Sequence, residues 1–511
     1  MNFQHLPKPR LPSAWPRRVT PLVMALFVAG CAAGPDYVAP APPVNRSYGA
    51  ERLHKATDSA PVSGGEAQQF STGRDLPAEW WTLFDSEALN TLIRRALQRS
   101  PGIAGAQAAL RQAQAVLEAQ RAAFYPTVQA GFSPSRQKNP VGTLAPTLNS
   151  GVPVYNLATA QVSVSYAPDV FGGNRRQVES LAAQAAYQRY QLEAAYLSLS
   201  SNIVVAAVQE AALRGQIVAT ERLISLQSEQ VSLFRSQNTL GAIAVADVVA
   251  QEAALAQTQA SLSQLRKQLA LQRDLLAALS GSLPDELPSE IFDLDALHLP
   301  TELPLSVPAD LVTQRPDVAA AAESLHAASA QVGVASANRL PQFLISGAYG
   351  GTSTQLSSLF SPGNIFWDIA GNVSQTLLDG GALHQRQLAS VAAYDQAAAQ
   401  YRQAVLLACQ NVADVLNALQ FDAEGLAAQV AAEQAASKSL DIARDALKAG
   451  AVSYLALITA EQTYQQASIN VVQARANRLS DTAALYAALG GGWWNRPAPV
   501  SSSGGGAPVL R

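Results

Sequence analysis

The chain has 511 residues, a formal charge of −3 and 14% charged residues, well below the average of about 25% for soluble domains. It contains no basic stripe interleaved with aromatic side chains, which argues against nucleic acid as a partner. Its two cysteines cannot form a disulfide framework, and the alanine-rich apolar fraction of 48% favours helices that pack against helices.

The N-terminus has the features of a secretory signal, with basic side chains up to Arg18 and then a short apolar run at 22–28. This run is too short to span a bilayer, which takes about 20 apolar residues. The Val-Ala-Gly-Cys sequence at 28–31 resembles the bacterial lipobox, in which the cysteine thiol is acylated before cleavage. We therefore expect residues 1–30 to be removed and Cys31 to carry diacylglycerol and an N-acyl lipid, with no other cofactor. The alternative is an ordinary secreted chain with a chance cysteine at this position.

The residue after this cysteine favours an outer-membrane destination. In enteric-type bacteria an aspartate at this position keeps lipoproteins in the inner membrane, and here the residue is Ala32. Residues 31–78, rich in Pro, Ala, Gly and Ser, are interpreted as a lipidated, extended tether. No later stretch is interpreted as a transmembrane helix, so any membrane crossing would need strands closed into a barrel.

The rest of the chain consists of two copies of one repeated sequence unit. Pro101 and Pro126 stand 25 residues apart, as do Pro316 and Pro341, and a glycine pair at 172–173 recurs at 380–381. Repetition of this kind predicts architecture more strongly than any single motif. Two equivalent halves are expected at 79–280 and 316–493, with an equatorial connector at 281–315 between them and a disordered tail at 494–511.

Each half contains a predicted hairpin of two strands of roughly ten residues, near 126–168 and near 341–378. In the first, Val128, Ala130 and Phe132 alternate with Gln129 and Gly131, which gives one apolar and one polar face. A half-buried soluble sheet shows the same alternation. Strands of about 9 to 11 residues also suit a tilted membrane barrel, and four strands could close one only by oligomerisation, because a barrel needs about eight.

Two segments free of proline, Gly173 to about Thr239 and Gly381 to about Lys448, predict helices roughly 100 Å long at about 1.5 Å per residue. The segments that follow them, about Val245–Ser280 and Ser453–Leu489, are near half that length, and a 22-residue helix precedes each hairpin. A long helix can therefore lie beside two short ones stacked end to end. Gln and Ser cover more than one helix face, as the wall of a water-filled tube requires.

These features together resemble the TolC-like outer membrane channels, and specifically their lipoprotein branch of the NodT/OprM type. The residues that carry the resemblance are the start at Cys31, Trp80-Trp81, Arg315 to Val318, and the strand exit from Leu377 to Gly381. The resemblance implies a mainly α fold with a membrane β-barrel, in which a homotrimer forms twelve strands, four from each chain. It also implies a long periplasmic α-helical barrel and an equatorial domain.

The resemblance further implies a location and a set of partners. The chain would lie in the cell outer membrane, anchored by lipid and extending into the periplasm. Its partners would be two further copies of itself, outer membrane lipid, a periplasmic membrane-fusion adaptor and an inner-membrane pump of the RND type.

In this family the turns between paired helices form a periplasmic tip that is closed at rest. Gly241 and Gly450 mark these turns, and Asp247 matches an aspartate that helps to hold the family's gate shut. A carboxylate in the first turn of a helix is also favoured by the helix dipole, whatever its role.

The second turn departs from the family pattern. Carboxylates that ring the constriction in other members are replaced by Ala456 and Thr459, and a family tyrosine is replaced by Leu447. A charged cation-binding ring is therefore not supported. Better candidates for an apolar constriction, unless they simply pack between helices, are Val452, Tyr454 and Leu455.

No catalytic or metal-binding constellation is predicted, because the five histidines are scattered and no phosphate-binding glycine pattern precedes a helix. The chain is therefore not expected to be an enzyme. The predicted function is a passive exit duct of a tripartite efflux system. One alternative is the same duct in type I protein secretion. Another is a lipid-anchored periplasmic coiled-coil scaffold, which would leave the alternating strands unexplained.

Overall fold

The computed structural model describes residues 33–41, 55–138, 154–286, 290–305 and 308–496. The chain divides into two compact units. The first comprises residues 1–38, 114–184 and 325–397, and the second comprises 39–113, 185–324 and 398–511. The acylation candidate Cys31 and residues 497–511 of the predicted tail lie outside the described residues. The first residues of that tail are ordered, since Trp494 and Asn495 both donate hydrogen bonds to the carboxylate of Asp75.

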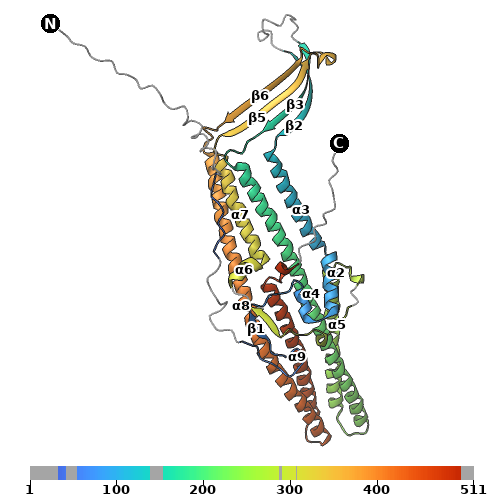
Figure 1. Ribbon diagram of the computed structural model, residues 1–511. Helices are drawn as coiled ribbons and strands as arrows, with labels where there is room; N and C mark the ends of the chain where they lie inside the picture. Colours follow the sequence, from blue (N-terminus) through green and yellow to red (C-terminus); the bar gives the residue numbers. More distant parts are fainter. Residues whose placement is uncertain (1–32, 42–54, 139–153, 287–289, 306–307, 497–511) are drawn as a thin grey trace, which may run out of the picture. The chain divides into compact units, whose positions relative to one another are not determined.

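The first unit contains a four-stranded antiparallel sheet in the order β2-β3-β5-β6 (Figure 1). The two predicted hairpins are the pairs β2-β3 and β5-β6, and β3 joins them by pairing with β5. The prediction of four strands of roughly ten residues is confirmed. Their bounds are Thr127–Lys138 (β2), Val154–Tyr166 (β3), Gln342–Ser353 (β5) and Ile365–Ser374 (β6).

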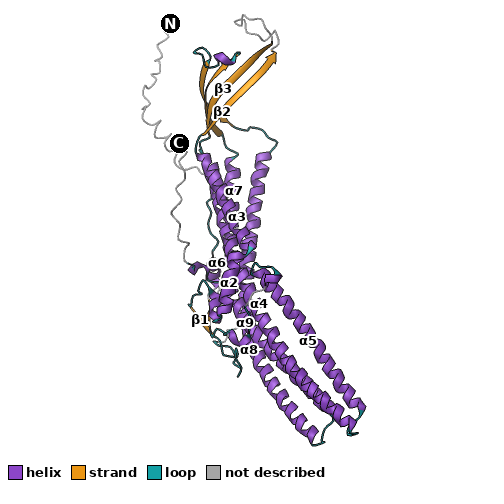
Figure 2. Ribbon diagram, turned by 90° about the vertical axis from the view of Figure 1, so that its right-hand side faces the viewer, coloured by secondary structure: helices purple, strands orange, loops and turns teal. Residues whose placement is uncertain are grey.

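Four helices, which Figure 2 labels α3, α4, α7 and α8, contribute residues to both units. Proline or glycine stands at the first position of three of them, and Gly381 directly precedes the fourth, α8. Proline is favoured at the first helical position because the missing N–H would have no partner there. The predicted long helices are confirmed, since α4 and α8 each contain 67 residues. The bounds are Pro101–Arg121 (α3), Gly173–Thr239 (α4), Pro316–Ala337 (α7) and Ala382–Lys448 (α8).

The second unit also contains the two returning helices, α5 (Val245–Leu279) and α9 (Tyr454–Ala488), with lengths as expected. Two shorter helices are α2 (Glu87–Arg99) and α6 (Pro308–Gln314). The core of this unit is apolar and aromatic: Tyr486 is fully buried, with its ring 5.7 Å from that of Trp80. The same core holds further side chains with no exposed surface, among them Phe84, Leu92, Ile93, Ile203 and Val412.

Part of the segment interpreted as a tether packs onto the second unit. Residues Gln69–Thr72 form strand β1, which pairs in parallel with β4 (Glu302–Leu305). The buried guanidinium of Arg478 on α9 donates to the carbonyls of Gly64 and Glu66. Desolvation of this cation is offset by those acceptors, so the N-terminal segment is bound to α9 rather than free of the fold.

Helices α4 and α8 each contain an 18-residue window that is long and apolar enough to cross a membrane by composition alone. In α4, 61% of that window is buried inside the protein, as in the core helix of a soluble unit, whereas in α8 only 22% is buried. Both helices were predicted from the sequence by their length, but neither apolar window was interpreted as a transmembrane helix.

Candidate functional site

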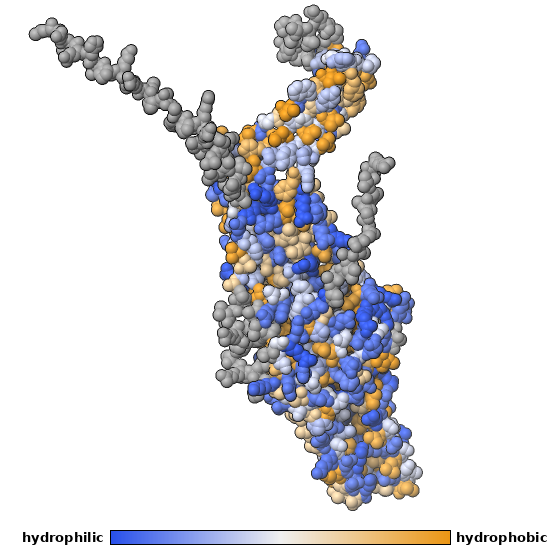
Figure 3. Space-filling model, viewed as in Figure 1, coloured by the Kyte–Doolittle hydropathy of each residue, from blue (hydrophilic) through white to orange (hydrophobic). Residues whose placement is uncertain are grey.

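The four-stranded sheet has one apolar and one polar face. Ala130, Val162, Tyr349 and Trp367 lie in register across all four strands, and residues two positions along each strand extend the same face. This face is uncovered, since Trp367 is 72% exposed and Ile369 is 77% exposed. In Figure 3, apolar side chains cover much of the sheet. An apolar surface of this extent, with no core against it, suits contact with lipid rather than water.

The opposite face carries mostly small and amide side chains. Successive residues of a strand point to opposite sides, so this face holds the residues between the apolar ones. Its one carboxylate is Asp368, in register with Ala348 of β5. Its uncharged polar members include Gln129, Gln161, Ser163, Ser346 and Asn372.

The sheet is open at both sides. Within the described part of the chain, β2 pairs only with β3, and β6 pairs only with β5. The outer edges of β2 and β6 therefore present unpaired backbone N–H and C=O groups, which must find partners if the sheet lies in lipid.

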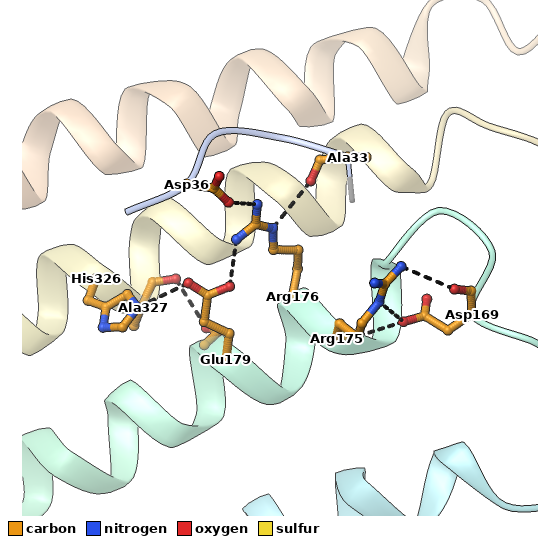
Figure 4. A network of polar contacts seen from close by, with 9 residues as sticks. Ala33, Asp36, Asp169, Arg175, Arg176, Glu179, His326 and Ala327 are labelled. Atoms are coloured by element: carbon orange, nitrogen blue, oxygen red, sulfur yellow. Dashed lines mark hydrogen bonds and ion pairs between the residues drawn. The ribbon is translucent and has the colours of Figure 1, made fainter. Parts of the chain in front are cut away.

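A short N-terminal segment is held against helices α4 and α7 of the first unit (Figure 4). The side chain of Arg176, only 8% exposed, pairs with Asp36 at 2.6 Å and with Glu179 at 2.8 Å. Its Nε also donates to the carbonyl of Ala33 at 3.4 Å, and the Ala33 N–H donates to the carbonyl of Phe171 at 2.9 Å. The segment at 33–36 is thus bound within a few residues of the acylation candidate Cys31.

His326 of α7 belongs to the same cluster. We call this cluster the seat of the N-terminal segment; it comprises Ala33, Asp36, Tyr37, Arg176, Glu179 and His326. Its Nε2 lies 3.0 Å from Glu179 Oε1, and the ring of Tyr37 stacks on the imidazole with centroids 4.2 Å apart. Burial alone would raise the pKa of Glu179, but the hydrogen bonds from Arg176 and His326 outweigh it and lower that pKa. The hydrogen bond that Arg176 donates to Asp36 raises the pKa of Arg176, so the seat is held by a carboxylate and a guanidinium that both stay charged.

The two helix turns of the second unit are built alike. The Ala242 N–H donates to the carbonyl of Gln237 at 2.8 Å and the Gly241 N–H to that of Asn238, and residues 446–451 repeat the pattern. This bonding requires a left-handed residue, and Gly241 and Gly450 have φ angles of +70° and +71°. The predicted turn glycines therefore end α4 and α8, and their conformational freedom explains why glycine stands at both positions.

The structure places Asp247 in the first turn of α5, Tyr454 and Leu455 in the first turn of α9, and Val452 two residues before α9. Tyr454 links the start of α9 to the last part of α4. Its hydroxyl donates to Gln237 Oε1 of α4 at 2.8 Å, and its ring packs against that of Phe234 with centroids 4.0 Å apart. Leu455 is 68% exposed, and Val452 is half-buried.

Asp247, also half-buried, lies in the first turn of α5, where no side chain caps the helix. No side-chain hydrogen bond of Asp247 occurs among the residues that the structure describes. Within one chain, its carboxylate therefore interacts only with the positive end of the α5 helix dipole. Within the described chain, Tyr454 therefore contacts α4, whereas no side-chain hydrogen bond connects Asp247 with the turn at Gly450.

A buried polar layer near the turns was missed by the sequence analysis. Glu461 of α9 has no exposed surface, and its Oε1 accepts a 2.5 Å hydrogen bond from Gln230 of α4. Gln251 of α5, equally buried, donates to Gln230 Oε1 at 3.0 Å. Burial raises the pKa of Glu461, which the glutamine bonds only partly oppose. This layer connects α4, α5 and α9. In the sequence, its only sign was a polar residue at a helix position where the pattern leads one to expect a buried apolar residue.

In the described part of the chain, no group of three or more His, Cys, Asp or Glu side chains is placed to hold a metal ion. The cysteine that the structure describes, Cys409, is a half-buried free thiol whose pKa is raised by burial. Neither observation identifies a cofactor site.

Comparison with known proteins identifies the family. The model of the outer membrane efflux protein family matches residues 92–282 and 307–491. The antibiotic efflux pump outer membrane protein ArpC of Pseudomonas putida is 29% identical over 479 residues, which cover 93% of this chain and 95% of that protein. The pyoverdine export outer membrane protein OpmQ of Pseudomonas aeruginosa is 28% identical, over 85% of this chain and 92% of that protein.

Solved structures agree with this assignment. The outer-membrane channel OprN matches with a TM-score of 0.81 and 27% identity, covering 91% of this chain and all of that one. VceC of Vibrio cholerae matches with a TM-score of 0.75 and 27% identity, over 82% of this chain and 100% of that one. The predicted TolC-like fold, outer-membrane location and efflux role are confirmed. The chain belongs to the outer membrane efflux protein family and is an outer membrane exit duct of an efflux system.

Proposed function

We propose that three copies of this chain assemble into one passive duct, with the apolar sheet face toward lipid and the polar face toward the lumen. The observation that supports this most strongly is the open sheet, with its exposed apolar face and two unpaired edges. Lipid tolerates no unpaired strand edge, so the strands must be completed by other copies. Three copies supply twelve strands, more than the roughly eight at which side chains fill the interior.

The long helix α8 provides a second argument for assembly. In the second unit it exposes Leu406, Phe421 and Ile442, each more than 60% exposed, on the helix whose apolar window is least buried. Burial of such side chains against a neighbouring copy contributes about 1.5–3 kcal/mol for each one fully covered. Packing between copies therefore accounts for apolar surface that a single chain leaves in water.

A lipid on Cys31 is part of the same proposal. Arg176 binds the segment that begins two residues after this cysteine, at Ala33, and Ala33 contacts Phe171 directly before α4. An acyl chain at Cys31 would therefore be held close to the junction between strands and helices, where the membrane surface lies.

The turns of the helix pairs are proposed as the docking site for a periplasmic adaptor, which connects the duct to an RND-type pump. These turns expose Leu240 (83%), Val245 (64%) and Leu455 (68%), an apolar group that a partner can cover. We propose no catalysis by this chain, so the driving force comes from the pump.

Small organic molecules are the proposed substrates. Relatives of this chain are named for efflux of antibiotics and toluene and for export of pyoverdine. These names favour efflux over secretion of a protein. Deletion of the gene should increase accumulation of fluorescent dyes and leave the secreted proteins unchanged. Normal dye accumulation together with loss of one secreted protein would instead support type I secretion.

We further propose that the resting duct is narrowed near Gly241 and Gly450, with Asp247, Val452, Tyr454 and Leu455 forming the constriction. Asp247→Ala should then raise the passive conductance of the purified channel in planar bilayers. Asp445→Ala is a matched control, because Asp445 lies near the other turn and pairs only with Lys448 in the described chain. Equal conductance of the Asp247 variant and the wild type would contradict a role for this carboxylate in closure.

A further inference from the structure

Two basic residues stand at the far end of the apolar face of β2. Arg136 and Lys138 follow Val128 at intervals of two residues, so their side chains share its face of the sheet. Both are exposed. Strand β2 begins at Thr127, three residues after the helical turn Ala122–Phe124, and ends at Lys138. The pair therefore lies at the end of the sheet that is away from the helices.

The hairpins provide no carboxylate that could neutralise this pair. Between residues 126 and 168 the sequence contains no acidic residue, and Arg136 and Lys138 are its only charged residues. Between 341 and 378 the only charged residue is Asp368. Asp368 lies on the opposite face, in a row that reaches β2 at Gln129, seven residues before Arg136. Neighbouring copies of the chain carry the same hairpins, so they add no acidic partner there.

This inference rests on the proposed orientation of the sheet, with its apolar face toward lipid, which would bring the pair close to the outer boundary of the hydrocarbon layer. From Val128 to Arg136 the strand rises about 26 Å at roughly 3.3 Å per residue. A tilt of about 40° reduces this to roughly 20 Å along the membrane normal, close to the apolar band of about 25 Å on membrane barrels. Long basic side chains at this level extend their charged ends into the headgroup region.

We propose that Arg136 and Lys138 bind the phosphate groups of outer-leaflet lipid. A guanidinium can bind two phosphate oxygens at once, and an ammonium adds a point charge beside it. Asn156 of β3 lies in register with Arg136 on the same face and offers a further amide donor. This binding would order a phosphorylated lipid on the outside of each copy and fix the depth of the barrel in the membrane.

The test is a lipid titration of the purified, intact channel in detergent, followed by native mass spectrometry. The probe is lipid A with both phosphates, compared with dephosphorylated lipid A and with inorganic phosphate as a competitor. The wild type should bind the phosphorylated lipid at least about tenfold more tightly, since each basic residue near a membrane surface contributes on the order of fivefold. The Arg136→Gln, Lys138→Gln variant should lose this preference.

A face-swapped variant is the matched control: Ser135→Arg, Arg136→Ser, Gln137→Lys and Lys138→Gln keep the net charge but move it to the polar face. It should lose the preference as well. Arg136→Lys with Lys138→Arg should retain it, which keeps the test decisive if the uncharged variant does not assemble. Retention of the preference in the face-swapped variant would overturn the proposal. So would equal binding of dephosphorylated lipid, or full competition by inorganic phosphate at the lipid's own concentration.

Discussion

The hydroxyl of Tyr454, in the first turn of α9, donates a 2.8 Å hydrogen bond to Gln237 Oε1, near the end of α4. These residues are separated by 217 positions, and their contact ties the two helix pairs of one chain together beside both glycine turns. If the duct opens when these pairs separate, this bond must break.

Tyr454→Phe should therefore raise the passive conductance of the resting channel. The substitution removes the hydroxyl but keeps the ring that packs against Phe234, so about 0.5–1.5 kcal/mol of the link is lost without a cavity. Single-channel recording in planar bilayers measures the open fraction, which should rise several-fold.

Tyr464→Phe is the control for the Tyr454 variant, because Tyr464 lies on the same helix and has no side-chain hydrogen bond within the described chain. Gln237→Leu should raise conductance as Tyr454→Phe does, and the double variant should add nothing further. Fully additive effects would show that the two side chains do not act through this bond.

Two neighbouring aspartates of the second unit, Asp481 and Asp422, should make the stability of the protein depend on pH. Burial raises the pKa of Asp481 on α9 to about 7, and its hydrogen bond with Asp422 of α8 adds to this. The folded protein then binds more protons than the unfolded chain between about pH 4 and pH 7, so stability falls as pH rises through this window. Above about pH 7 the Asp481 carboxyl is deprotonated in both the folded and the unfolded state, so this group no longer makes stability change with pH.

Asp481→Asn should remove that slope and raise the thermal midpoint at pH 8 by about 2–4 °C, the effect of roughly 1 kcal/mol in a large domain. Partial exposure of the pair to solvent keeps the effect this small. Asp445→Asn, on the exposed surface of α8, should leave the slope unchanged. Thermal scans from pH 4 to pH 8 make the measurement, and an unaltered slope in Asp481→Asn would refute the assignment.

Arg176 should control the order of the N-terminal segment. Arg176→Gln removes the partners of Asp36 and of the Ala33 carbonyl, and charged hydrogen bonds of this kind contribute about 1.5–3 kcal/mol. Hydrogen exchange of residues 33–38 in the intact protein should accelerate about tenfold or more. Its neighbour Arg175 pairs with Asp169 instead, so Arg175→Gln should not change exchange in this segment. Identical exchange in both variants would argue against the seat.

The two faces of the sheet should respond oppositely to a positive charge. Ile369→Lys places an ammonium on the face assigned to lipid, at a cost of about 2–4 kcal/mol near the membrane midplane. Ala370→Lys, one residue further, places it on the face assigned to the lumen. Heat-stable oligomers recovered from outer membranes should fall sharply for the first variant and remain for the second. Equal recovery would mean that the faces are wrongly assigned.

Much of the fold could be predicted because its signals are local. Pro101 and Pro316 start helices since they lack an N–H, and Gly241 and Gly450 end them since they adopt positive φ. Strict alternation, as at Val128 to Phe132, predicted both hairpins and their apolar face. These rules act within a few residues, so one sequence suffices to apply them.

The parts that escaped prediction depend on contacts between distant segments. Strands β1 and β4 have four residues each and pair across more than 200 positions, so neither shows a periodic pattern. The link from Glu461 to Gln230 joins residues 231 positions apart, and their burial follows from helix packing alone. The roles of Cys31, Asp247, Val452 and Leu455 stay predictions, because contacts within one chain do not test them.

The mass of the complex extracted from the outer membrane in mild detergent tests the central claim most directly. Native mass spectrometry should find three copies of the chain, which together supply the twelve strands of one duct. A mass of a single chain, or of two chains with only eight strands, would contradict the account.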